Sequence, residues 1–139
     1  MRRFSIFALL MSLSVGALAA QTTATADSFD AVAFFTSGLI DGEPIDRIDR
    51  ATLEQDVVVL YVDWGKMRRR AYRTEVRIVD PNGNTVGKTK VIIQPTSDRH
   101  HTYYFYRPSP QDTPGDWTYQ VYVDGRNAFE ARIPILAAD

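Results

Sequence analysis

Apolar and polar residues alternate with a period of two along most of the chain, and this alternation predicts β-strands rather than helices. The segment from Val57 to Trp64, VVVLYVDW, has apolar residues on both parities and is predicted to be an interior strand covered on both sides. Residues 31–37 form another apolar segment, which also predicts a strand. The polar stretch that follows, LIDGEPIDRID at 39–49, is predicted to be its exit loop.

Turn residues divide the second half of the chain into two predicted hairpins. Residues 73–79 alternate, DPNGN at 80–84 is a turn sequence, and residues 85–94 return as the second strand. The last hairpin turns at Asp124-Gly125, a strong two-residue signal. It is expected to bury Trp117, Tyr119, Val121 and Val123 on one strand, and Phe129, Ala131, Ile133 and Ile135 on the other. Pro134 lacks a backbone N–H, which predicts an edge or a sheet's end for the last strand.

These segments amount to about seven strands separated by short turns. Helix is not predicted beyond the first 20 residues, apart from a single turn at 52–55. The predicted fold class is therefore all-β, with a single antiparallel β-sandwich over residues 30–139. A domain of this size buries enough apolar surface to fold without disulfides.

Two sequence pieces carry a resemblance to known proteins. PGDWTYQVYVDG at 114–125 and GLIDGEPIDRI at 38–48 resemble exported bacterial immunoglobulin-like and fibronectin-like sandwich families that have no assigned function. The resemblance implies an immunoglobulin-like sandwich. Its distinctive residues, Pro114, Gly115, Trp117 and the Asp124-Gly125 turn, are structural in such sandwiches, so no catalytic role is carried over.

The first 19 residues have the three parts of a secretory signal peptide. Arg2 and Arg3 provide the positive start, residues 4–13 are apolar, and Ala17-Leu18-Ala19 is a cleavage sequence. The apolar run is shorter than the roughly 20 residues that span a bilayer. We therefore expect cleavage, a flexible tether at 20–29, and a periplasmic or secreted protein that does not span the membrane.

Composition and motifs exclude several functions. Without Arg2 and Arg3 the chain has 14 basic and 17 acidic residues, and this mild acidity argues against nucleic-acid binding. There is no cysteine, and the known hydrolase, metalloprotease and phosphate-loop motifs are absent. We therefore expect no enzymatic activity and no cofactor.

A cluster of cations is the main candidate binding site. GKMRRRAYR at 65–73 carries Lys66, Arg68, Arg69, Arg70 and Arg73, five positive charges in nine residues of an acidic domain. Arginine side chains suit carboxylate, phosphate or sulfate groups, which indicates docking of an anionic partner. The alternative is a solvated loop paired with Asp46, Asp49, Glu54 or Asp56.

RHHTYYFYRP at 99–108 is the second candidate. In a strand Tyr103 and Phe105 share one face, and Tyr104 and Tyr106 share the other. We take Tyr104 and Tyr106, with Tyr122 of a neighbouring strand, as a candidate exposed strip that binds sugars or protein. The alternative is aromatic pairing that only stabilises the sheet.

Metal binding is not expected in this stretch. His100 and His101 point to opposite sides of a strand and so do not converge on one ion. The chain has only two histidines and no cysteine to complete a site. The acidic stretches fit known calcium loops no better, because DPNGN lacks the spacing and the terminal glutamate.

The favoured hypothesis is a non-catalytic exported interaction module that binds a cell-envelope protein, a glycan or an anionic lipid. The alternative is a small enzyme or a carbohydrate-binding accessory domain that uses acidic and aromatic residues around a cleft. A pilus-type chaperone or subunit, which uses an open sheet edge, is a third possibility, although the sequence shows neither a second domain nor a donor strand.

Overall fold

The computed structural model describes residues 21–23, 31–97 and 99–138, and every regular element in these ranges is a β-strand. The all-β prediction is therefore confirmed. The predicted signal peptide, residues 1–19, lies outside the described residues. The long strands are β2 (Val32–Thr36), β6 (Val58–Asp63), β7 (Tyr72–Val79), β8 (Thr85–Ile93), β9 (His101–Tyr106), β10 (Gly115–Val123) and β11 (Arg126–Leu136). The short strands are β1 (Gln21–Thr23), β3 (Leu39–Ile40), β4 (Glu43–Pro44) and β5 (Ala51–Thr52).

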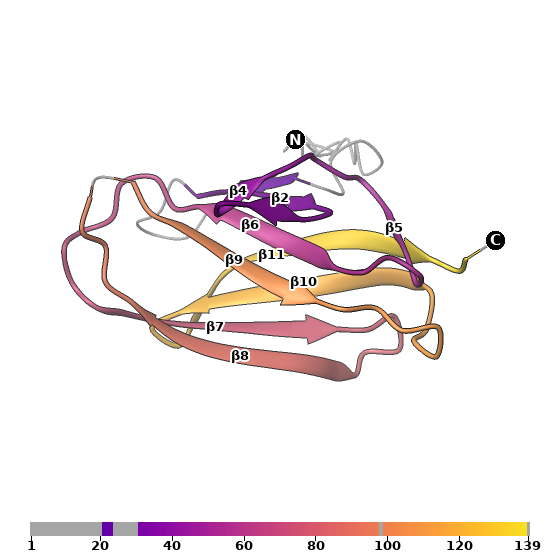
Figure 1. Ribbon diagram of the computed structural model, residues 1–139. Helices are drawn as coiled ribbons and strands as arrows, with labels where there is room; N and C mark the ends of the chain where they lie inside the picture. The colour runs from indigo at the N-terminus through magenta and orange to yellow at the C-terminus, as the bar shows by residue number, and fades with distance from the viewer. Residues whose placement is uncertain (1–20, 24–30, 98, 139) are drawn as a thin grey trace, which may run out of the picture.

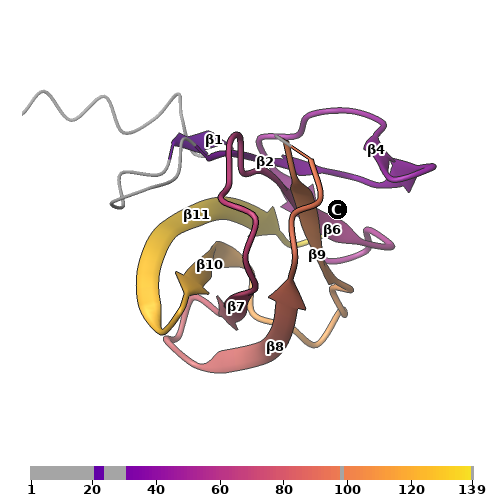
Figure 2. The ribbon, with the colours of Figure 1, turned by 90° about the vertical axis from the view of Figure 1, so that its left-hand side faces the viewer.

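Two sheets pack face to face as a β-sandwich (Figure 1 and Figure 2). The small sheet has the order β1-β2-β6-β9, and the large sheet has the order β5-β11-β10-β7-β8. All pairs of long strands are antiparallel, and only β5 runs parallel to its neighbour β11. The segment expected to be a tether, residues 20–29, contains β1, which pairs with β2.

The core lies between the inner faces of the sheets. Val58, Leu60 and Val62 of β6 belong to it, while Val59 and Tyr61 are buried on the opposite face of the same strand. The interior strand predicted from VVVLYVDW is thus confirmed. Across the core, Phe35 of the small sheet meets Tyr119 of the large sheet edge to face, with ring centroids 5.1 Å apart.

The segment predicted to be an exit loop instead pairs with β2 through Ile48 and places Arg47 over the Phe34 ring. Residues 39–44 form the small β3–β4 hairpin, and Ile48 N–H donates to the carbonyl of Phe35 at 2.9 Å. Asp46 Oδ1 accepts bonds from Thr36 Oγ1 and Ser37 N–H, each at 2.8 Å, and the Arg47 guanidinium lies 4.1 Å from the ring centre of Phe34. The segment is thus fixed to β2, and Arg47 covers the ring of the buried Phe34.

The last hairpin confirms its prediction. All eight residues expected inside are buried, and Asp124 and Gly125 turn the chain with φ angles of 50° and 80°. Trp117 is fully buried opposite Ile133, and its Nε1–H donates to the carbonyl of Thr113 at 3.0 Å. In the described part of the chain, β11 has an outer neighbour only at Ile135–Leu136, so Pro134 lies at the sheet edge as predicted.

We expect Trp117→Ala to lower the free energy of unfolding by about 3–5 kcal/mol, because it leaves a cavity between the sheets. Chemical denaturation followed by circular dichroism measures this change. Asp116→Ala, on the exposed face of the same strand, is the control and should change stability by less than about 0.5 kcal/mol. Equal effects of the two substitutions would contradict the burial of the indole.

Candidate anion-binding site

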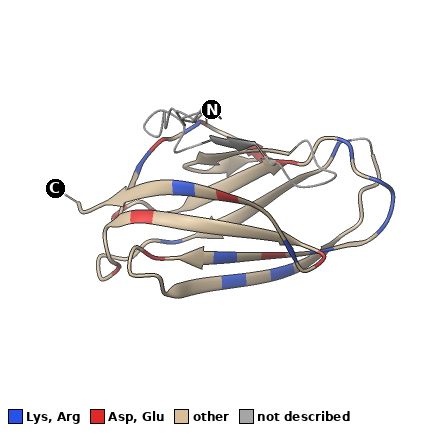
Figure 3. Cartoon of the chain, turned by 180° about the vertical axis from the view of Figure 1, so that it is seen from behind, with Lys and Arg blue, Asp and Glu red and all other residues tan. Residues whose placement is uncertain are grey.

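Basic side chains gather at one end of the sandwich. The β6–β7 loop, the β8–β9 loop and the β10–β11 turn all lie there, at the left of Figure 1. Figure 3 shows Lys and Arg along this end, at the right of that view. We call this group the basic end. It comprises Lys66, Arg68, Arg69, Arg70, Arg73, Arg99 and Arg126.

Three buried side chains hold the β6–β7 loop in place. Trp64, Met67 and Tyr72 are buried, while Lys66 and all three consecutive arginines are exposed. The indole Nε1–H of Trp64 donates to Thr102 Oγ1 at 2.7 Å, and the Tyr72 hydroxyl accepts the backbone N–H of Arg68 at 3.1 Å. The apolar residues at these three positions therefore direct the cations between them into solvent.

A second tie joins this loop to the β8–β9 loop. Asp63 accepts the backbone N–H of Gly65 at 2.9 Å and the Arg99 guanidinium at 2.6 Å. Partial burial would raise the pKa of Asp63, but these hydrogen bonds outweigh it, and the pKa is lowered. Asp63 is therefore ionised at neutral pH and offsets the charge of Arg99.

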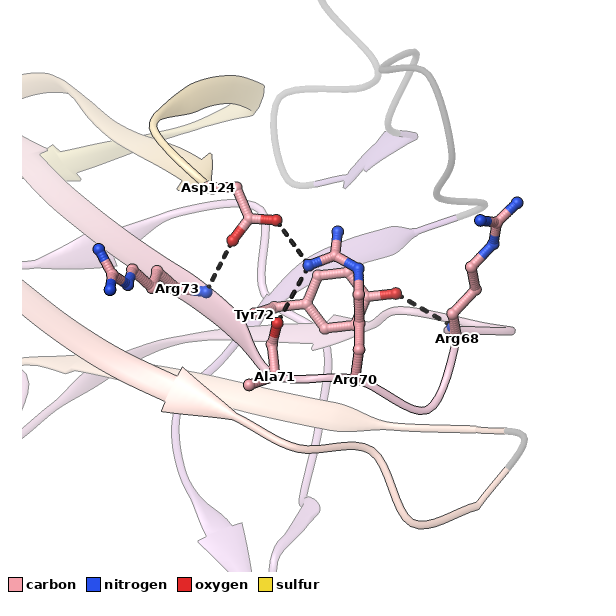
Figure 4. A network of polar contacts seen from close by, with 6 residues as sticks. All are labelled: Arg68, Arg70, Ala71, Tyr72, Arg73 and Asp124. Atoms are coloured by element: carbon pink, nitrogen blue, oxygen red, sulfur yellow. Dashed lines mark hydrogen bonds and ion pairs between the residues drawn. The ribbon is translucent and has the colours of Figure 1, made fainter.

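Asp124, in the β10–β11 turn, binds two arginines of the basic end (Figure 4). Its carboxylate accepts the Arg73 backbone N–H at 3.0 Å and pairs with Arg70 Nη1 at 2.9 Å. The Arg70 guanidinium also lies 3.8 Å from the ring centre of Tyr72. The backbone bond from Arg73, followed by the bond from Arg70, lowers the pKa of Asp124. Arg70 is thus held in one position with its charge offset.

Three cations of the loop have no such compensation. Among the described residues, the side chains of Lys66, Arg68 and Arg69 make no ion pair or hydrogen bond. Figure 4 shows the Arg68 side chain directed away from the network. The structure therefore separates the predicted cluster into three free cations on the loop, the structural arginine Arg70, and Arg73, which lies in β7 and donates its backbone N–H to Asp124.

Four acidic residues were expected as possible partners of this loop. In the described ranges two of them bind other residues, and the other two make no ion pair with the loop. Asp46 is bound by Thr36 and Ser37, and Asp49 pairs with Arg50 at 3.2 Å. No ion pair links the loop to Glu54 or Asp56 in the described ranges. The partner is Asp124, which the sequence presented only as a turn residue.

An open hollow of about 760 Å³ adjoins the network. Its lining comes from β7, β8 and the β10–β11 turn, and consists of Arg73, Thr74, Glu75, Lys90, Val91, Ile92, Asp124 and Gly125. Glu75 pairs with Lys88 at 3.0 Å and Arg77 at 3.1 Å, and these bonds lower its pKa. Both acids of the hollow are thus ionised at neutral pH, with their charges offset by partners.

The aromatic strip is reversed from the sequence prediction. Tyr104 is buried, and Tyr106 is half-buried with its hydroxyl on Asp112 at 2.9 Å and its ring 5.0 Å from Trp117. The exposed pair is Tyr103 and Phe105, at 42% and 53% exposure. The prediction failed because aromatic residues occupy both parities of this strand, so the sequence does not show which side faces the core.

Tyr122, the third residue of the predicted strip, is not fully exposed either. It lies on the outer face of the large sheet, half-buried, with the Arg77 guanidinium 4.6 Å from its ring centre. Tyr122 therefore does not join the β9 aromatics, which belong to the other sheet.

The histidines do not form a metal site in the described part of the chain, where no three potential ligands converge. His100 is partly buried, and this burial, followed by the charge of His101, lowers its pKa. His101 is exposed on the outer face of β9, with its ring 5.4 Å from that of Tyr61.

Comparison with known proteins gives a limited result. No protein-family profile matches the chain, and no curated protein is similar to it in sequence. Among solved structures, an immunoglobulin-like protein from Pseudomonas aeruginosa is similar at 12% identity and a TM-score of 0.49, covering 83% of this chain and 98% of that chain. No residue role follows from a similarity of this size. Within the described ranges, no helix is long and apolar enough to cross a membrane.

The lowered pKa of Asp124 predicts a pH effect. Its contribution to stability is complete above the unfolded-state pKa, about 3.9, and is lost as the pH falls through the lower folded-state pKa. We expect Asp124→Asn to be less stable than the wild type at pH 7, and the difference to shrink as the pH is lowered below about 4. Thermal melts across this range measure it.

Asparagine is the suitable replacement because it tolerates the positive φ of this turn. Asp116→Asn, which changes an exposed carboxylate outside the network, is the control. A difference between Asp124→Asn and the wild type that stays constant with pH would contradict the role of the carboxylate.

Proposed function

We propose that this protein is a non-catalytic immunoglobulin-like binding module, exported to the periplasm or secreted, that docks an anionic partner through the basic end. One observation carries the proposal. Lys66, Arg68 and Arg69 are displayed without partners in the described structure, on a loop held by Trp64 and Tyr72, although the whole chain has a net charge of −1.

The electrostatics of the loop support binding rather than solvation alone. Like charges on one short loop repel each other, and an anion placed among them relieves that repulsion. Arginine side chains present several N–H groups in a fixed plane, which suits phosphate, sulfate or carboxylate oxygens. Because Trp64 and Tyr72 hold the loop, little backbone freedom is lost on binding, and the remaining entropy cost is that of ordering the three side chains.

The alternative of an enzyme has weaker support. A general acid needs a carboxyl group whose pKa is raised towards neutrality. In the hollow, Glu75 and Asp124 both have lowered pKa values, because each accepts hydrogen bonds and faces cations. A flat sugar platform is also poorly supported, because Tyr103 and Phe105 meet at 77° instead of lying coplanar.

Replacing Lys66, Arg68 and Arg69 together by serine tests the proposal. We expect the wild type to be retained on immobilised heparin or on anionic vesicles at low salt, and to elute as salt screens the charges. The triple variant should lose this retention while its stability changes by about 0.5 kcal/mol or less. Retention on only one matrix would assign the anion to a glycan or to a lipid.

A charge-matched variant controls for net charge. Arg50→Ser, Lys88→Ser and Arg132→Ser together remove three exposed cations from other surfaces. This variant should retain wild-type binding. If both triple variants lose retention equally, or if the wild type shows none at low salt, the basic end is not a docking site.

Export is tested independently. We expect material from the periplasm or medium to begin at Ala20, because cleavage follows Ala17-Leu18-Ala19. Intact-mass measurement identifies the N-terminus, and replacing both Arg2 and Arg3 by glutamate should reduce export. Folded cytoplasmic protein that retains Met1 as the sole product would contradict the assignment.

A further inference from the structure

The outer edge of β9 is a second surface, separate from the cations of the β6–β7 loop. In the described part of the chain β9 pairs only with β6, so its other side lies at the edge of the small sheet. An edge strand presents unpaired backbone N–H and C=O groups, to which another extended chain can bind. Whether such an edge binds another chain depends on which backbone and side-chain groups it exposes, and on whether lysine, proline or a bulge protects it.

The register shows which backbone groups are free. Trp64 N–H donates to the carbonyl of His100 at 2.9 Å, and the β6–β9 pairing continues without a bulge. Because hydrogen-bonded pairs alternate in an antiparallel ladder, Thr102 and Tyr104 direct their backbone groups to β6. His101, Tyr103 and Phe105 direct theirs to the free edge. The same three residues place their side chains on the outer face, opposite Asp63, Tyr61 and Val59.

In the described part of the chain, β8 and β11 of the large sheet carry residues that protect an edge, but β9 does not. Edge strands are commonly guarded by lysine, proline or bulges. β8 carries exposed Lys88 and Lys90, and β11 carries Pro134. β9 has none of these devices, and its outer face instead exposes the edge-to-face pair Tyr103 and Phe105, with ring centroids 5.6 Å apart.

Charges at the two ends of β9 indicate the chemistry of the occupant. Arg99 precedes the strand and Arg107 follows it, and both are exposed. Arg99 also pairs with Asp63, but its side chain remains 71% exposed and keeps free donors. In a two-fold pairing of β9 with a second copy centred on Tyr103, Arg99 would face Arg107 of the other copy. That repulsion disfavours self-association and favours a strand with acidic ends.

We propose that the free edge of β9 binds an extended segment of a partner protein by strand addition, and that this segment has apolar residues at its centre and acidic residues at both ends. Backbone bonds to His101, Tyr103 and Phe105 hold the segment. Its apolar side chains cover Tyr103 and Phe105, and its acidic ends meet Arg99 and Arg107.

Hydrogen exchange with a defined probe tests this proposal. The probe is a short synthetic peptide of alternating valine and threonine with two glutamates at each end. In the free protein, the amides of His101, Tyr103 and Phe105 should exchange quickly, whereas those of Thr102, Tyr104 and Tyr106 are protected by β6. Adding the peptide should protect the first set selectively. The same peptide with lysine ends should bind at least tenfold more weakly.

A pair of substitutions separates backbone pairing from side-chain contact. Tyr103→Pro removes a free-edge N–H without removing a bond to β6, and proline is tolerated at such positions. Tyr103→Thr removes the ring and keeps the N–H. We expect the proline variant to lose at least tenfold in peptide affinity, and the threonine variant to lose clearly less. The serine variant of Lys66, Arg68 and Arg69 should keep peptide binding, which separates this proposal from that of the basic end.

Several results would overturn the proposal. One is the absence of protection at His101, Tyr103 and Phe105 with saturating peptide. Another is equal binding of a peptide whose central residues are all N-methylated, a test that needs no variant to fold. Protection that rises with protein concentration without peptide would assign the edge to a second copy instead.

Discussion

Trp64 fixes both candidate surfaces, the basic end through its indole side chain and the free edge of β9 through its backbone N–H. Its ring is fully buried and packs against Phe129 of the large sheet, with ring centroids 5.8 Å apart, while its Nε1–H bonds Thr102 of β9. The side chain therefore closes one end of the core and anchors the loop that carries the cations. Its backbone N–H bonds His100, which sets the phase of the β6–β9 ladder and so decides which amides of β9 face the free edge.

Repulsion among the cations of the basic end is reduced because two of the arginines have compensating partners. Arg70 is compensated by Asp124 and by the Tyr72 ring, and Arg99 is compensated by Asp63. Exposed ion pairs contribute little to stability on their own. Here their effect is positional, because each ties two loops of the basic end together. The uncompensated charges are those of Lys66, Arg68 and Arg69, whose side chains are exposed to solvent.

The sequence predicted the buried face correctly for strands in which one face is apolar and the other is polar. Trp117 to Val123 and Thr74 to Ile78 alternate cleanly, so burial on one face followed directly and proved correct. β9 has rings on both faces, and its orientation depends on a bond to Trp64 that the order of residues does not reveal. The β3–β4 hairpin has two residues per strand, too few to show a period. Asp124 pairs with Arg70 only because the register of β7 and β10 brings them together.

The two surfaces meet at Arg99, which belongs to the basic end and also precedes β9. A strand bound along β9 would therefore bring one acidic end close to the cations of the neighbouring loop, and a single partner can engage both. The two contributions respond differently to salt, because screening weakens attraction between exposed charges while backbone hydrogen bonds and covered aromatic surface persist. Arg99 and Arg107 also respond to salt, so the wild type is compared with the serine variant of Lys66, Arg68 and Arg69. Equal falls to the same plateau would indicate the edge of β9 alone, a steeper fall in the wild type would indicate joint use of both surfaces, and a fall to zero would indicate the basic end alone.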